Sequence, residues 1–184
     1  MPSFLTSCKK ALLVAVFIMP FAGSAQTTKQ DSIWQPFKFF VGNWQGQGGG
    51  EPGIGEYERA YQFVLGKKFI EVRNKSTYPP SDNYPKGEVH ENIDFFSYDK
   101  GRQSFVLRQF HIEGFVNQYK LESISADGKR IVFVSEAIEN IPAGWRAKET
   151  YQILNDNQFQ ETFELAEPNK EFNVYTTVTL TRVN

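Results

Sequence analysis

Residues 39–50 read FFVGNWQGQGGG: two bulky aromatic residues, a G-x-W step and then a run of alternating glycines. Trp44 is a large apolar side chain at the start of a predicted strand, and it is suited to filling one end of a core. The glycines after it let the backbone bend sharply and let another segment or a ligand approach closely. The rest of the chain must therefore supply what Trp44 packs against.

Beyond Gly42, apolar residues recur with a period of two rather than 3.6, which is typical of half-buried strands. About ten such segments follow one another, mostly joined by short turns, and no helix of ten or more residues lies between them. We therefore predict an all-β fold, an antiparallel up-and-down β-barrel preceded by a short helical turn from Ser32 to Phe40. The predicted strands begin at Gly42 and continue over 57–65, 69–73, 88–98, 104–112, 115–124, 130–137, 145–154, 159–165 and 172–182.

The N-terminus has the three parts of a secretory signal peptide. Lys9 and Lys10 precede an apolar run over 11–22, which is too short for a stable membrane-spanning helix, and small residues follow up to Ala25. We expect cleavage after Ala25 and an exported protein, periplasmic or secreted. The predicted division is a signal peptide over 1–25, a leader with the short helical turn over 26–38 and one barrel domain over 39–184.

Composition excludes several kinds of site from the predicted mature chain. The sole cysteine of the full chain, Cys8, and both methionines lie within residues 1–25 and are lost with the signal peptide. Disulfides, zinc–thiolate sites and a cysteine nucleophile are therefore excluded. The remaining 18 basic and 21 acidic residues give a net charge of −3, which does not favour binding to nucleic acid. We expect a small-molecule ligand, no nucleic acid, no membrane insertion, and a monomer or homodimer.

Polar residues interrupt the apolar faces of several predicted strands. Burying one such charge without a partner costs several kcal/mol, so their recurrence predicts a shared, hydrated cavity that holds a ligand. The expected ligand is apolar or amphipathic, with Arg59 neutralising an anionic group. Three alternatives remain: bulges that reverse the alternation, strand-end positions in contact with water, and a structural Arg59–Glu161 salt bridge. The candidate ligand-binding residues are Trp44, Arg59, Tyr61, Glu91, His111, Asn117, Glu149 and Glu161.

The signals for catalysis are few. Glu149 and Glu161 lie on neighbouring predicted strands, and a pair of carboxyls with one raised pKa can perform general acid–base chemistry, so an enzyme remains an alternative. No nucleophile elbow, P-loop or dinucleotide-binding motif is present in a suitable context. His111 is a candidate ligand or base, whereas His90 lies on the opposite side from Val89 and Ile93 and is expected to face solvent.

The G-x-W step before a ten-strand meander resembles the calycin superfamily, which includes the lipocalins and fatty-acid-binding proteins. This resemblance implies that a basic residue of the last strand covers Trp44 at the closed end of the barrel. Arg182 is the candidate, and a cation–π stack of this kind contributes about 0.5–2 kcal/mol. More narrowly, residues 40–50 resemble the opening of the nitrobindin-type heme-binding β-barrels, with the pattern G-x-W-x-G-x-G-x-G.

The narrower resemblance implies a heme cofactor and a proximal histidine on the last strand. Tyr175 occupies the matching position, and no histidine follows His111. Since tyrosine can also ligate ferric heme, Tyr175 and His111 are the candidate iron ligands and heme binding is an alternative function. Strand alternation turns Tyr175 away from the side of Trp44, and only a bulge would bring it inward.

Overall fold

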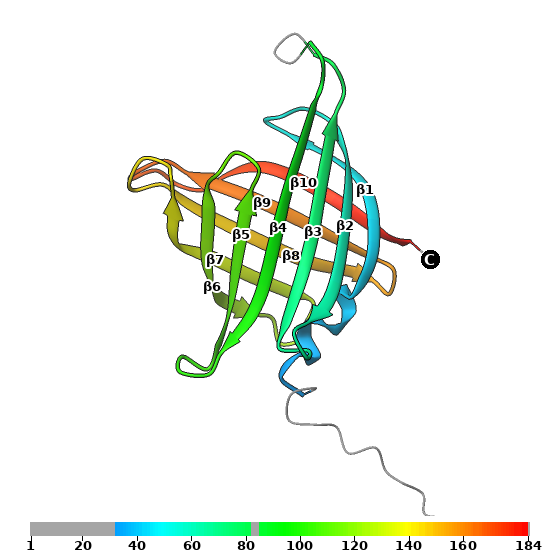
Figure 1. Cartoon of the computed structure of the whole chain (residues 1–184), viewed down its shortest axis with the longest axis vertical. Helices are drawn as coiled ribbons and strands as arrows, with labels where there is room; N and C mark the ends of the chain where they lie inside the picture. The colour runs from blue at the N-terminus through cyan, green and yellow to red at the C-terminus, as the bar shows by residue number, and fades with distance from the viewer. Residues whose placement is uncertain (1–31, 82–84, 184) are drawn as a thin grey trace, which may run out of the picture.

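The computed structural model describes residues 32–81 and 85–183 of the chain. Ten antiparallel strands form a closed barrel in which each strand pairs with its neighbours in sequence and β1 pairs with β10 (Figure 1). The predicted all-β, up-and-down barrel is confirmed. The strands are β1 Gly42–Gly50, β2 Gly55–Val64, β3 Phe69–Tyr78, β4 Glu88–Asp99, β5 Ser104–His111, β6 Val116–Ile124, β7 Arg130–Glu139, β8 Arg146–Asn155, β9 Gln158–Ala166 and β10 Asn173–Val183.

One end of the barrel is closed by aromatic side chains. The short 3-10 helix η1, Gln35–Phe40, lies at that end, and it contains Pro36 in its first turn (Figure 1). Phe37 and Phe40 are buried, with ring centroids 4.5 Å from Phe105 and 5.0 Å from Phe159, respectively. The helical turn expected before the barrel is thus the plug of its closed end.

Trp44 lies in this plug and is covered by the last strand, as the calycin resemblance implies. Its indole Nε1 donates a hydrogen bond to the Phe40 carbonyl oxygen at 2.6 Å. The Arg182 guanidinium carbon lies 4.1 Å from the centroid of the Trp44 ring. The same guanidinium donates hydrogen bonds to the Val41 and Phe39 carbonyl oxygens, so it also satisfies backbone acceptors at the end of η1. The predicted cation–π stack is confirmed.

The glycines of β1 allow close packing against β10. A Cβ atom at Gly46 would collide with the Thr179 carbonyl oxygen, and one at Gly48 with the Thr177 carbonyl oxygen. At Gly49, by contrast, the nearest atom would lie 3.5 Å away, at an ordinary contact distance. The alternating glycines therefore allow a neighbouring strand, rather than a ligand, to approach β1 closely.

The signal peptide predicted over 1–25 and the adjoining leader up to residue 31 lie outside the described residues. Within the described part, no helix is both long enough and apolar enough to cross a bilayer.

Candidate functional site

Above the aromatic plug, the barrel contains a cavity of about 840 Å³. Strands β2 to β10 all contribute side chains to its walls. Apolar groups such as Phe163 and Leu165 alternate there with polar ones, several of which are buried. We call the polar residues at mid-height the polar belt; it consists of Arg59, Asn74, Asp94, Gln109, Asn117, Glu149 and Glu161.

One ion pair of the belt connects two strands that are not neighbours in the barrel. Arg59 Nε lies 3.1 Å from Glu161 Oε2, and the Tyr61 hydroxyl donates to Glu161 Oε1 at 2.8 Å. Burial lowers the pKa of Arg59, but the nearby Glu161 and Tyr61 outweigh it, and the net pKa lies above the ordinary value. The pair joins β2 to β9 across β1 and β10. Gly46 and Gly48, on the Trp44 face of β1, add no side chain between the two partners.

Two further carboxyls belong to the belt, Asp94 on β4 and Glu149 on β8. Asp94 accepts hydrogen bonds from the Asn74 and Gln109 amides at 2.8 and 3.4 Å, and Gln109 also donates to Glu149 at 3.3 Å. Burial raises the pKa of Asp94 to about 7 despite these hydrogen bonds. Burial, together with the charge of Glu161, raises the pKa of Glu149 well above its usual range. These two carboxyls therefore hold protons at higher pH than ordinary acids do.

The raised pKa of Asp94 predicts an unusual dependence of stability on pH. The unfolded chain loses this proton near pH 4 and the folded chain near pH 7, so the folded state binds more protons between these values. The free energy of unfolding should fall as pH rises from about 4 to 8, by on the order of 4 kcal/mol from this residue. Urea denaturation at a series of pH values would measure the slope.

Asp94→Asn should remove the part of this slope that Asp94 contributes between pH 4 and 8, while the part from Glu149, whose pKa is also raised, remains. Asp99→Asn is the matched control, because the Asp99 side chain is 36% exposed and hydrogen bonds from Arg102 lower its pKa, so its titration lies on the acid side of this range. A slope that is equal in wild type and Asp94→Asn would contradict the assignment of this proton to Asp94.

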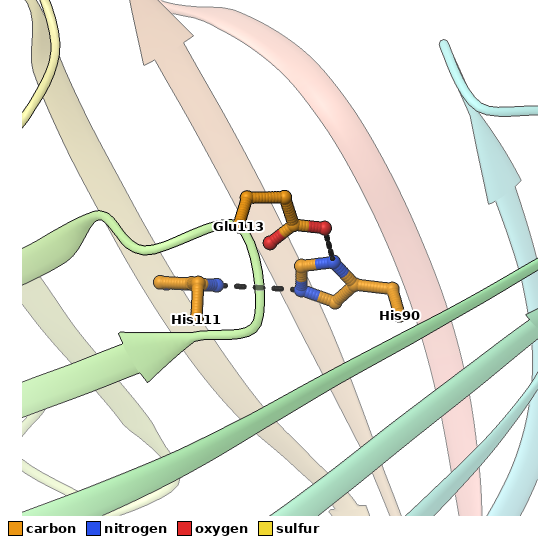
Figure 2. Close-up of side chains that lie close together, drawn as sticks. All are labelled: His90, His111 and Glu113. Atoms are coloured by element: carbon orange, nitrogen blue, oxygen red, sulfur yellow. Dashed lines mark hydrogen bonds and ion pairs between the residues drawn. The ribbon is translucent and has the colours of Figure 1, made fainter.

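The mouth of the cavity brings both histidines of the chain together. His90 of β4 and His111 of β5 face each other, with His111 Nδ1 3.3 Å from His90 Nε2 (Figure 2). His90 Nδ1 lies 2.7 Å from a carboxylate oxygen of Glu113. Burial and the neighbouring His90 lower the pKa of His111 to about 3, so its ring is neutral over the physiological range.

The expected orientation of β4 is wrong. Glu91 is exposed on the outer face together with Val89 and Ile93, while His90 and Asp94 point into the barrel. The prediction assumed that Val89 and Ile93 mark the inner face of the strand. In the first half of β4 the inward positions are instead His90, Asn92 and Asp94, which line the cavity, while Val89 and Ile93 point outward. Glu91 therefore leaves the set of candidate ligand-binding residues.

The other candidates occupy the expected interior. Arg59, His111, Asn117, Glu149 and Glu161 line the cavity, whereas Trp44 and Tyr61 belong to the aromatic core at its closed end. Sequence reasoning missed Asn74, Ser76 and Asp94. The predicted third strand stopped at Arg73, and continuing its alternation from Ile70 and Val72 would have placed Asn74 and Ser76 inside.

Glu149 and Glu161, the candidate acid–base pair, both face the cavity from adjacent strands. They differ in environment, because Glu161 bonds to Arg59 and Tyr61 while Glu149 bonds to the neutral Gln109. Such a difference separates a proton donor from an ionised partner, which is what acid–base chemistry requires.

The two candidate heme ligands, Tyr175 and His111, lie in different environments. The pairing of β10 with β9 shifts register between Val174 and Thr176, and Tyr175 lines the mouth of the cavity. The bulge needed to turn this residue inward is therefore present. His111 does not fit an axial heme ligand, because His90 lies 3.3 Å from one ring nitrogen and the Asn117 amide 3.3 Å from the other, which leaves no room for a porphyrin ring beside either nitrogen. The His111 ring also stacks on the Phe115 ring, with 4.1 Å between the two ring centroids.

Comparison with solved structures supports the fold alone. Rv2717c from M. tuberculosis superposes with a TM-score of 0.63 at 14% sequence identity, over 83% of this chain and 98% of that one. A de novo designed fluorescence-activating β-barrel reaches a TM-score of 0.40 at 13% identity, over 79% of this chain and 94% of the design. No protein-family model and no curated protein sequence matches the chain. The likeness to Rv2717c therefore shows that this chain shares its β-barrel fold.

Proposed function

We propose that this protein binds a small amphipathic molecule inside the barrel. The observation that carries the proposal is the cavity of about 840 Å³, whose walls combine aromatic side chains with the polar belt. Ligand sites in proteins have this character: mostly apolar walls and a few convergent polar groups. A core without a ligand would instead be expected to fill this volume with apolar side chains.

The charges of the cavity favour a neutral or positively charged polar group on the ligand. Arg59 is the sole Lys or Arg among the described residues that line the cavity, and Glu161 already neutralises it at 3.1 Å. Asp94 and Glu149 add acidic groups without a basic partner of their own in hydrogen-bond contact. An anionic group, expected from Arg59 alone, would find this cation already paired with Glu161, and it would oppose ionisation of Asp94, whose pKa is about 7. A protonated carboxyl can donate a hydrogen bond to a hydroxyl group, and an ionised one can pair with an amine. We therefore expect the polar group of the ligand to be an alcohol or an amine, and not the anionic group expected from the sequence.

Thermal unfolding scans with matched probes test this proposal. We expect long-chain alkyl amines and alcohols to raise the melting temperature, and fatty acids of the same chain length to leave it unchanged. Ile138→Trp, at the wall of the cavity, should abolish the shift, whereas Ile93→Trp, on the outer face, should preserve it. The absence of any shift, together with native mass spectra that show no co-purified ligand, would overturn the proposal.

Heme binding is a second candidate, favoured by the register shift that brings Tyr175 to the mouth of the cavity. A hemin titration should then give a saturable Soret band that Tyr175→Phe removes. Tyr98→Phe is the control, because Tyr98 packs against the core rather than lining the cavity. A band that is unchanged in Tyr175→Phe would exclude this residue as the ligand.

We further propose that the protein is exported and cleaved after Ala25, on the basis of the basic, apolar and small-residue segments of residues 1–25. N-terminal sequencing of the protein from its native host should begin at Gln26, and an intact Met1 on the accumulated protein would contradict export.

A further inference from the structure

The two histidines of the chain form a fixed pair with a nearby carboxylate at the mouth of the cavity. His90 and His111 are 21 residues apart in sequence and lie on adjacent strands, both on the inner side of the wall (Figure 2). One possible ligand atom from each of His90, His111 and Glu113 lies within 4.8 Å of the other two. No other group of three such side chains occurs within residues 32–81 and 85–183.

The spacing of the two imidazoles suits a transition-metal ion. Zinc binds imidazole nitrogen at about 2.0–2.1 Å, so two nitrogens at a tetrahedral ion stand about 3.3 Å apart. His111 Nδ1 and His90 Nε2 are separated by 3.3 Å. The two rings therefore already have the separation that a shared ion requires.

The surroundings hold both rings in place. His111 stacks on Phe115 with an interplanar angle of 23°, and its Nε2 lies 3.3 Å from the Asn117 amide. As placed, the Asn117 amide nitrogen faces Nε2 and also donates to the Gln109 oxygen and the Tyr119 hydroxyl. An ion at Nδ1 requires the tautomer with the proton on Nε2, so metal binding is coupled to a rotation of the Asn117 amide that brings its oxygen to this proton and gives up the other two contacts. A histidine ligand whose second nitrogen bonds to a polar neighbour is the usual arrangement in metal sites.

Glu113 is brought over His90 by the turn between β5 and β6. The Gly114 nitrogen donates to the His111 carbonyl oxygen at 2.9 Å, and Gly114 has a φ of +89°, which favours glycine. The Glu113 side chain is 42% exposed, so it can rotate without disturbing the core. It can therefore either ligate the ion or keep its bond to His90 Nδ1 and orient that ring.

From this geometry we propose that His90 Nε2, His111 Nδ1 and Glu113 form a binding site for a divalent transition-metal ion, with zinc as the type case. The site lies on the cavity wall, so the remaining coordination positions face the interior and can take water or a donor atom of a bound molecule. Two imidazoles with one carboxylate and an open position are the donor set of many reactive metal centres. This inference goes beyond the proposed function and does not depend on it.

Isothermal titration with Zn²⁺ alone tests the proposal. The protein should be the full chain with Cys8→Ser and no polyhistidine tag, because a free thiol or added imidazoles would also bind the metal. We expect one ion per chain. His90→Gln and His111→Gln should each weaken binding at least 100-fold, and Glu113→Gln about tenfold or more. Glu91→Gln, the same charge change next to His90 but on the outer face, should bind as wild type does.

Binding that is equally strong in His90→Gln, His111→Gln and wild type would overturn the site, as would the absence of binding by wild type. If the histidine variants do not fold, proton NMR of the wild-type protein decides the question, since the two imidazoles are the only ones in the chain. One equivalent of Zn²⁺ should shift the ring resonances of both, and unchanged resonances would disprove the site. These measurements use no amine or alcohol probe. Thermal scans in which those probes give no shift would therefore count against the proposed ligand and would leave the test of the metal site unaffected.

Discussion

Gly46→Ala is expected to lower the free energy of unfolding by about 3–5 kcal/mol, among the largest effects that single substitutions produce. The added methyl group would collide with the Thr179 carbonyl oxygen of β10. Because that atom belongs to the backbone of a paired strand, relief requires movement of β1 away from β10 at the seam that closes the barrel. Urea denaturation monitored by tryptophan fluorescence would measure the loss, since Trp44 is buried two residues earlier.

Gly49→Ala is the matched control on the same strand. The methyl group at this position would meet its nearest atom, in Ile54, at 3.5 Å, so we expect a change of less than about 1 kcal/mol. Equal losses for Gly46→Ala and Gly49→Ala would show that a general preference for glycine, rather than contact with β10, governs this segment.

Arg59→Met should destabilise the protein by about 3–5 kcal/mol, because it leaves Glu161 nearly buried beside Tyr61 without its cation. The side chains of Arg59 and Glu161 are only 10% and 13% exposed, so water can replace little of the lost interaction. The double variant Arg59→Met with Glu161→Leu should recover most of the loss, since no charge then remains without its partner. Chemical denaturation of the single and double variants would complete this thermodynamic cycle.

Lys75→Met provides the comparison for an exposed pair on the neighbouring strand. Lys75 Nζ lies 3.6 Å from Glu58, with side chains 46% and 55% exposed, so its removal should cost less than about 1 kcal/mol. If Arg59→Met costs no more than Lys75→Met, the Arg59–Glu161 pair is not the buried link between β2 and β9 that its geometry indicates.

The fold was accessible from sequence because its signals are local. Alternation with a period of two and turn residues between the segments predicted about ten strands, and the described residues form ten. The inward positions of Asn117, Glu149 and Glu161 could be assigned because apolar residues flank each of them on the same face. The cover of Trp44 by Arg182 followed from the calycin resemblance, and its geometry is specific to two strands that meet only when the barrel closes.

Features that depend on partners across the barrel could not be read from the sequence. On β4, the apolar Val89 and Ile93 face solvent while Asp94 faces the belt, so local hydrophobicity indicated the wrong side for Glu91 and His90. The belt carries buried polar groups because partners from distant strands satisfy them, as Asn74 and Gln109 do for Asp94.

By itself, the sequence determined the strand content, the closed-end tryptophan and the polar character of the interior, because each depends on residues that are close along the chain. Only the tertiary structure decided which polar groups meet. The pairing of β4 with β5 places Asn92 opposite His111 and so brings His90 within 3.3 Å of it. The shifted register of β10 at Tyr175 was equally invisible, because a one-residue change in pairing reverses a side chain's face without any mark in the local pattern.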